Sequence, residues 1–87
     1  MVRSFSEWKT ITISRLIEIK KKNTGDDIRS NKIARDVDVL ITKLQYLRAR
    51  DLGTWLVLLY HASADSEEFL ELAPTAEEIK EWFKEDA

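Results

Sequence analysis

Five apolar residues recur at alternating intervals of four and three in the middle of the chain. No other sequence feature constrains the fold as strongly. They are Ile33, Val37, Leu40, Leu44 and Leu47. On an α-helix these positions lie along one side, so the segment from about Asp27 to Arg50 is expected to be helical with one buried face. The spacing leaves two interpretations open: one straight helix in a bundle, or two short helices joined by a turn.

Val39 separates these two interpretations. In an unbroken helix Val39 points away from the apolar stripe, whereas in a helix-turn-helix the turn carries one apolar residue into the core. Asp38, just before it, tolerates the left-handed backbone that such a turn often requires. Ala34 is small enough for two crossing helices to approach closely. We therefore favour the broken arrangement and predict a turn at residues 37–39 with Val39 buried.

Capping patterns mark the starts of two other helices. Ser4 and Glu7 form a capping box at the start of a helix expected from about Phe5 to Lys22. Thr75 and Glu78 form the same pattern immediately before the last helix. The chain is therefore expected to hold a helix before the central segment and another close to its end.

The segment between the central helices and the last helix is ambiguous. Residues 54–62 form a mostly apolar run that is too short for its period to be read, and residues 68–72 partly alternate in polarity. Turn-forming residues lie between them. We interpret the segment as a β-hairpin. Two short helices, the second capped by Asp65 with Glu68, remain the alternative.

The stretch Ser30–Ala49 resembles the twenty-residue helix-turn-helix of DNA-binding proteins. With a hairpin after it, the chain resembles a winged helix, as found in many small prokaryotic and archaeal regulators. This resemblance implies an α+β fold in a single domain over residues 1–87: a helix, a helix-turn-helix, a short β-hairpin and a C-terminal helix. The alternative is an all-α bundle.

The resemblance also implies which residues meet duplex DNA. The second helix would present Lys43 and Gln45 to base edges in the major groove. The helix before it would bind phosphate through its N-terminal N–H groups, and arginines would add further phosphate contacts. The expected DNA-binding residues are Arg29, Ser30, Asn31, Lys32, Arg35, Thr42, Lys43, Gln45, Tyr46 and Arg48.

The charge distribution agrees with a basic contact surface. Residues 1–50 hold twelve Lys and Arg against six Asp and Glu, whereas residues 51–87 hold two against ten, for a formal net charge of −2. Nucleic acid is bound by a local basic face rather than by a basic total. The sequence therefore predicts a basic surface in the first half and an acidic region in the second.

A homodimer is expected from the last helix, predicted from about Ala76 to Lys84. Its narrow apolar stripe of Ile79, Trp82 and Phe83 lies on an acidic background. Aromatic residues often anchor such contacts, and a two-fold pair would place two recognition helices on one face of DNA. The alternative is that this helix packs back on the first helix near Trp8.

No residue pattern indicates catalysis, so the chain is not expected to be an enzyme. It has no cysteine, a single histidine (His61) and two isolated glycines, and no metal, small-molecule cofactor or membrane partner is expected. With no export signal recognised, the expected location is the cytoplasm. The expected function is sequence-dependent or general duplex DNA binding, by a small transcriptional regulator or nucleoid-associated protein. The alternative is a protein–protein interaction adaptor without nucleic-acid binding.

Overall fold

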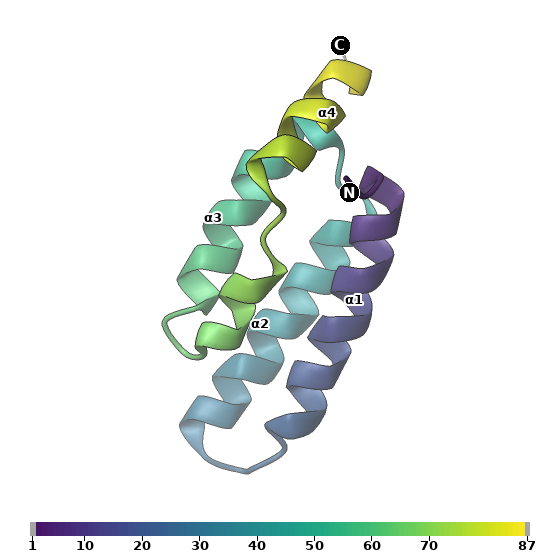
Figure 1. The fold of residues 1–87 in the computed structure, drawn as a ribbon. Coiled ribbons are helices and arrows are strands. Elements are labelled where there is room, and N and C mark those ends of the chain that lie inside the picture. Colours follow the sequence, from purple (N-terminus) through teal and green to yellow (C-terminus); the bar gives the residue numbers. More distant parts are fainter. Residues whose placement is uncertain (1, 87) are drawn as a thin grey trace.

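Every regular element in the computed structural model, which describes residues 2–86, is a helix (Figure 1). Two 18-residue helices come first, then two short 3₁₀ segments interleaved with two 11-residue helices. In chain order they are α1 (Phe5–Lys22), α2 (Ile28–Gln45), η1 (Ala49–Asp51), α3 (Leu52–Ala62), η2 (Glu67–Leu72) and α4 (Ala76–Asp86). The all-α alternative is therefore correct, and the predicted winged helix is wrong.

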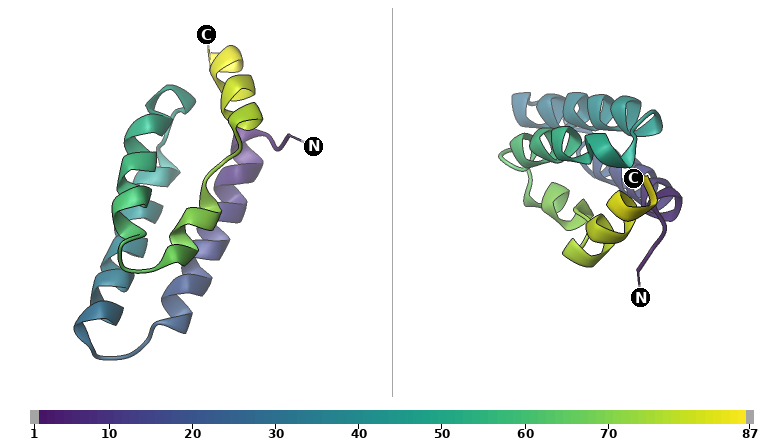
Figure 2. Two further views of the ribbon diagram at one scale, coloured as in Figure 1. Left: turned by 60° about the vertical axis from the view of Figure 1, so that its left-hand side comes forward. Right: turned by 90° about the horizontal axis from the view of Figure 1, so that it is seen from above.

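The helices form an elongated bundle of 44 × 22 × 20 Å. α1 and α2 are an antiparallel hairpin, α3 returns along α2, and η2 packs between α3 and α1 (Figure 2). α4 extends the bundle at the end opposite the α1–α2 loop, where it contacts η1 (Figure 1). The start of α1 and the whole of α4 therefore lie at the same end of the molecule.

The expected β-hairpin is wrong because residues 54–72 contain no strand. The apolar run belongs to α3, which buries Leu52, Trp55, Leu59 and Ala62 at helical spacing. Leucine favours helix more than strand, and the run is long enough for three turns once it starts at Leu52. The alternating residues form η2, which begins after Ser66 as its N-cap and buries Phe69 and Leu72.

The predicted turn at residues 37–39 is also wrong, because α2 continues without a break through Asp38. Val39 is 42% exposed, and no non-glycine residue in the described chain has a positive φ. The stripe of Ile33, Val37, Leu40 and Leu44 is buried along one side, as the straight-helix interpretation requires. α1 has the same length as α2 and packs along it, so the stripe is buried without a kink.

The first helix begins and ends where the sequence predicts. The Ser4 hydroxyl accepts a hydrogen bond from the Glu7 backbone N–H at 3.1 Å, and the Glu7 carboxylate accepts one from the Ser4 N–H at 3.4 Å. Asn23 ends the helix, and its side-chain amide donates to the Ile19 carbonyl at 2.7 Å. Both ends of α1 are thus fixed by local hydrogen bonds that the sequence specifies.

Three buried tryptophans form the centre of the core at the α4 end. The Trp8 ring centroid lies 5.3 Å from those of both Trp55 and Trp82, and the ring of Trp55 meets Trp8 edge to face. Each indole N–H donates to a backbone carbonyl at 2.9–3.1 Å: Trp8 to Leu72, Trp55 to Leu40, and Trp82 to Arg3. The rings are therefore buried with no indole N–H left unsatisfied.

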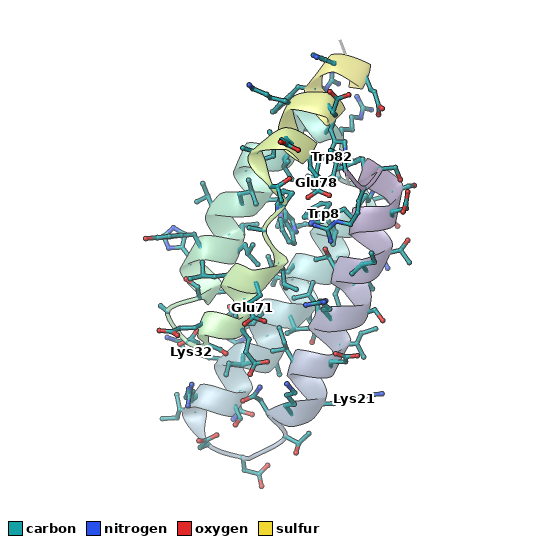
Figure 3. The ribbon with its side chains drawn as sticks, viewed as in Figure 1. Trp8, Lys21, Lys32, Glu71, Glu78 and Trp82 are labelled. Atoms are coloured by element: carbon teal, nitrogen blue, oxygen red, sulfur yellow. The ribbon has the colours of Figure 1, made fainter. Side chains whose placement is uncertain are left out.

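An ion pair joins Arg3 of the N-terminal segment to Glu78 of α4, which lies near Trp8 and Trp82 at the α4 end of the bundle (Figure 3). Arg3 donates from Nε and Nη2 to the two carboxylate oxygens of Glu78 at 2.7 and 3.0 Å, and Glu78 also completes the predicted capping box with Thr75. The Glu78 side chain is only 2% exposed. The hydrogen bonds from Arg3 outweigh this burial and lower the pKa of Glu78 from 4.5 to about 2.

We expect Glu78→Gln to destabilise the protein on the order of 2 kcal/mol at pH 7, less than the pKa difference alone implies, because Arg3 is partly exposed. Since the folded-state pKa is depressed, this contribution is complete above pH 4.5 and is lost as the pH falls to about 2. Urea unfolding of both proteins at pH 7 and pH 3 measures it.

Glu77→Gln is the matched control, since Glu77 is the exposed neighbour on the same helical turn. It should leave the free energy of unfolding within about 0.5 kcal/mol of wild type. Equal effects of the two substitutions, or a Glu78→Gln effect that is the same at both pH values, would contradict the assigned role of the ion pair.

Candidate functional site

Most of the residues expected to bind DNA lie on the exposed outer face of α2 or directly after it. A straight helix places positions separated by three or four residues on one side. The six residues brought together in this way, all of them exposed, are Asn31, Lys32, Arg35, Thr42, Lys43 and Tyr46. The face exists because the buried stripe occupies the opposite side of the same helix.

The other four expected residues do not join this face. Arg29 points to the loop after α3, where its Nε donates to the Asp65 carbonyl at 3.0 Å. Ser30 is half-buried beside the N-cap Asp27, to which its N–H donates. Gln45 and Arg48 are exposed, but Gln45 lies off the face and Arg48 follows the helix. Within residues 2–86 no separate recognition helix is present to gather them.

A shallow groove separates the outer faces of α2 and α3. It consists of two depressions of about 300 and 280 Å³, and Leu58 of α3 contributes to both. We call it the α2–α3 groove and define it by Lys32, Arg35, Val39, Lys43, Tyr46, Thr54, Leu58 and His61, with Asp51 and Asp65 at the two ends of α3. The two helices run antiparallel along it (Figure 2).

The α2 side of this groove includes exposed apolar and aromatic side chains. Val39 and Tyr46 lie on its α2 side, at 42% and 83% exposure. Val57 and Tyr60, at 55% and 71%, are exposed on α3 but line neither depression. Apolar side chains that remain exposed together, beside a groove, are a feature of surfaces that contact other molecules.

The charge split of the sequence is not a charge split in space. The acidic second half folds back onto the basic first half, because η2 packs against α1 and the loop after α3 reaches the start of α2. Two lysines of the first two helices consequently pair with carboxylates of the second half, and Lys20 pairs with Asp38 within the first half. The pairs are Lys20 with Asp38 at 2.8 Å, Lys22 with Glu68 at 3.5 Å and Lys32 with Asp65 at 3.9 Å.

The groove itself carries both signs of charge. Its cations, Lys32, Arg35 and Lys43, come from α2, whereas Asp51 and Asp65 lie at the two ends of α3. Asp36 of α2 is half-buried in the depression that also contains Asp65. Burial raises the pKa of Asp36, and the nearby Asp65 carboxyl raises it further. A purely basic surface is thus not formed here.

The expected dimer surface on α4 is interrupted. Trp82 is only 2% exposed because Phe5 and Trp8 of its own chain cover it, with Phe5 and Trp82 centroids 5.2 Å apart. Ile79 is half-buried against the core, and Phe83 is 45% exposed. The alternative, in which α4 packs back near Trp8, is what the structure shows. The homodimer stays a prediction, but Trp82 is not available as its anchor.

Sequence reasoning missed the α3 side of the groove, namely Thr54, Leu58 and His61. These residues were assigned to a strand, where alternate side chains point to opposite faces. The signal that identifies them is the helical spacing of the buried residues of α3. Once that spacing is recognised, Thr54, Leu58 and His61 fall together on one side of the helix, beside its buried face.

Other kinds of site find no support among the described residues. Within residues 2–86 no three His, Cys, Asp or Glu side chains are grouped to hold a metal ion. None of the helices there combines the length and apolar character needed to span a bilayer. The chain matches no protein-family model, no curated protein and no solved structure. The α2–α3 groove contains four of the exposed α2 residues predicted from the sequence, Lys32, Arg35, Lys43 and Tyr46, and it is the feature on which we base a functional proposal.

Proposed function

We propose that the chain is a protein-interaction module that binds another protein chain through the α2–α3 groove. The observation that carries this proposal is the pair of exposed side chains Val39 and Tyr46, in a groove where two helices meet. The core is complete without them, because all three tryptophans and the buried stripe of α2 are covered by the chain itself. They are therefore free to be buried by a partner.

The composition of the groove supports a protein partner. Protein interfaces combine apolar and aromatic anchors near the centre with a polar rim, and tyrosine is enriched among the residues that contribute most to affinity. Val39 and Leu58 supply the apolar centre here, Tyr46 is an exposed aromatic, and Lys32 and Lys43 lie on the rim. This arrangement fits a small adaptor.

Photo-crosslinking tests the proposal in cells that produce the chain. A benzophenone amino acid at Tyr46 places the reactive group in the groove, and the same residue at Phe83 places it on α4, outside the groove. We expect a protein adduct from position 46, and we expect Val39→Asp to reduce it at least about tenfold by placing a charge in the apolar centre.

Ile17→Asp is the matched control, because Ile17 on α1 is 43% exposed and Val39 is 42% exposed. Both variants should keep the helical circular dichroism of wild type, since exposed positions tolerate polar substitution. The proposal fails if the position-46 adduct is insensitive to Val39→Asp, or if Ile17→Asp reduces it equally.

Duplex DNA binding, in a cytoplasmic regulator, is the second proposal. It is favoured by the placement of Lys32, Arg35 and Lys43 on one exposed face of an 18-residue helix. The carboxylates of Asp51 and Asp65 at the edges of that face work against it, because they repel phosphate.

A gel shift with mixed duplex DNA at two salt concentrations tests the second proposal. DNA binding predicts a salt-sensitive complex that Lys43→Glu weakens strongly, because the change reverses an outward charge on the contact face. Absence of a complex at low salt, or equal affinity of wild type and Lys43→Glu, would remove it.

A further inference from the structure

The charged residues of the α2–α3 groove, apart from Asp36 of α2, are divided by sign between its two sides. We call the depression near η1 the upper one and the depression near the start of α2 the lower one. In the upper depression Lys43 of α2 lies with Asp51, which immediately precedes α3. Lys32 and Arg35 of α2 share the lower depression with Asp65, which follows α3. At both ends the cations come from α2 and a carboxylate from an end of α3, although the lower depression also holds Asp36 of α2, and Lys32 already pairs with Asp65 within one chain.

The centre of the groove is apolar. Val39 of α2 and Leu58 of α3 line the lower depression together, and Leu58 continues into the upper one. Val57 lies on the adjoining outer face of α3 and is 55% exposed. The groove thus has an apolar middle and opposite charges on its two sides at each end.

This pattern is complementary to itself under one particular rotation. A two-fold axis parallel to the helices, in the plane of contact, lays α2 of one copy over α3 of the other. The same axis keeps each end of the bundle opposite the same end of the second copy. Lys43 then faces Asp51 of the second copy, Lys32 and Arg35 face its Asp65, and Val39 faces its Leu58. A two-fold interface requires this kind of reciprocal pairing.

We propose that the α2–α3 groove binds a second copy of this chain, in a two-fold dimer with α2 laid over α3. This inference rests on the proposed function, because it names the partner of the same surface. In the dimer Lys43 and Asp51, which form no ion pair within the described part of one chain, each gain an opposite partner. A strongly acidic peptide or duplex DNA, by contrast, would leave Asp51 and Asp65 facing negative charge.

The residues needed for a charge-exchange experiment are suitably exposed. Lys43 and Asp51 are both exposed, and neither takes part in an ion pair within the described part of the chain. Reversing either charge therefore breaks no ion pair that holds the fold. Circular dichroism and urea unfolding of each variant establish that the fold is retained.

The experiment compares Lys43→Glu, Asp51→Lys and their equimolar mixture by sedimentation velocity at low salt. In the proposed dimer each variant alone brings like charges together at both reciprocal contacts, so we expect its dissociation constant to rise about ten- to hundredfold. In the mixture one contact pairs the introduced glutamate of one chain with the introduced lysine of the other. The second contact pairs the unchanged Lys43 and Asp51, so we expect a heterodimer with an affinity near that of wild type.

Lys21→Glu is the control, since it makes the same charge change at an exposed position of α1 and should leave the dimer intact. A wild-type chain that stays monomeric at millimolar concentration would overturn the dimer. A dimer whose two variants do not recover affinity on mixing would overturn the proposed pairing. Neither result bears on the binding of a different protein, which the photo-crosslinking experiment tests separately. The failure of the dimer and the failure of the proposed function can therefore be distinguished.

Discussion

The structure depends on the packing of Trp8 against Trp55 and Trp82. These rings come from α1, α3 and α4, so one contact cluster joins three of the four α-helices. Their N–H groups extend the connection to the backbone of α2, η2 and the N-terminal segment. Burial of a large aromatic side chain contributes several kcal/mol, which is a large part of the stability available to a domain of this size.

Because this cluster buries all three tryptophans, it also determines which aromatic residues remain exposed. With the three tryptophans covered, the exposed aromatic residues are Tyr46, Tyr60 and Phe83, and two of these lie on or beside α2 and α3. The straight path of α2 then places Lys32, Arg35, Val39 and Lys43 along one exposed side of a single helix. The same helix therefore buries its stripe in the core and contributes one wall of the groove.

Local signals were read correctly from the sequence, and interpretations that depended on tertiary context were not. The Ser4 and Thr75 capping boxes and the extent of α1 follow from hydrogen bonds between neighbouring residues. Whether Val39 is buried depends on how α1 packs along α2, which the spacing of apolar residues in α2 does not specify. The strand assigned to residues 54–62 failed because a short leucine-rich run carries no clear period.

The α2 residues of the candidate site could be predicted from local sequence signals, whereas its α3 residues could not. Thr42, Lys43, Gln45 and Tyr46 were predicted to point outward, and Lys32 and Arg35 to contact phosphate; all six are exposed. Their neighbours on α3 were missed because that segment was assigned to a strand. The carboxylates that offset the basic charge come from residues distant in sequence, as with Lys32 and Asp65, so charge counts over each half could not reveal them.

The central claim is that α2 is one continuous helix whose outer face forms the groove, and NMR of the backbone at residues 36–42 tests it most directly. A continuous helix predicts helical ¹³C secondary shifts at Val37, Asp38 and Val39, contacts between Hα and the amide three residues later across Asp38, and slow amide exchange at Val39. Non-helical shifts at residues 37–39, with interrupted contacts and a fast-exchanging Val39 amide, would contradict the account.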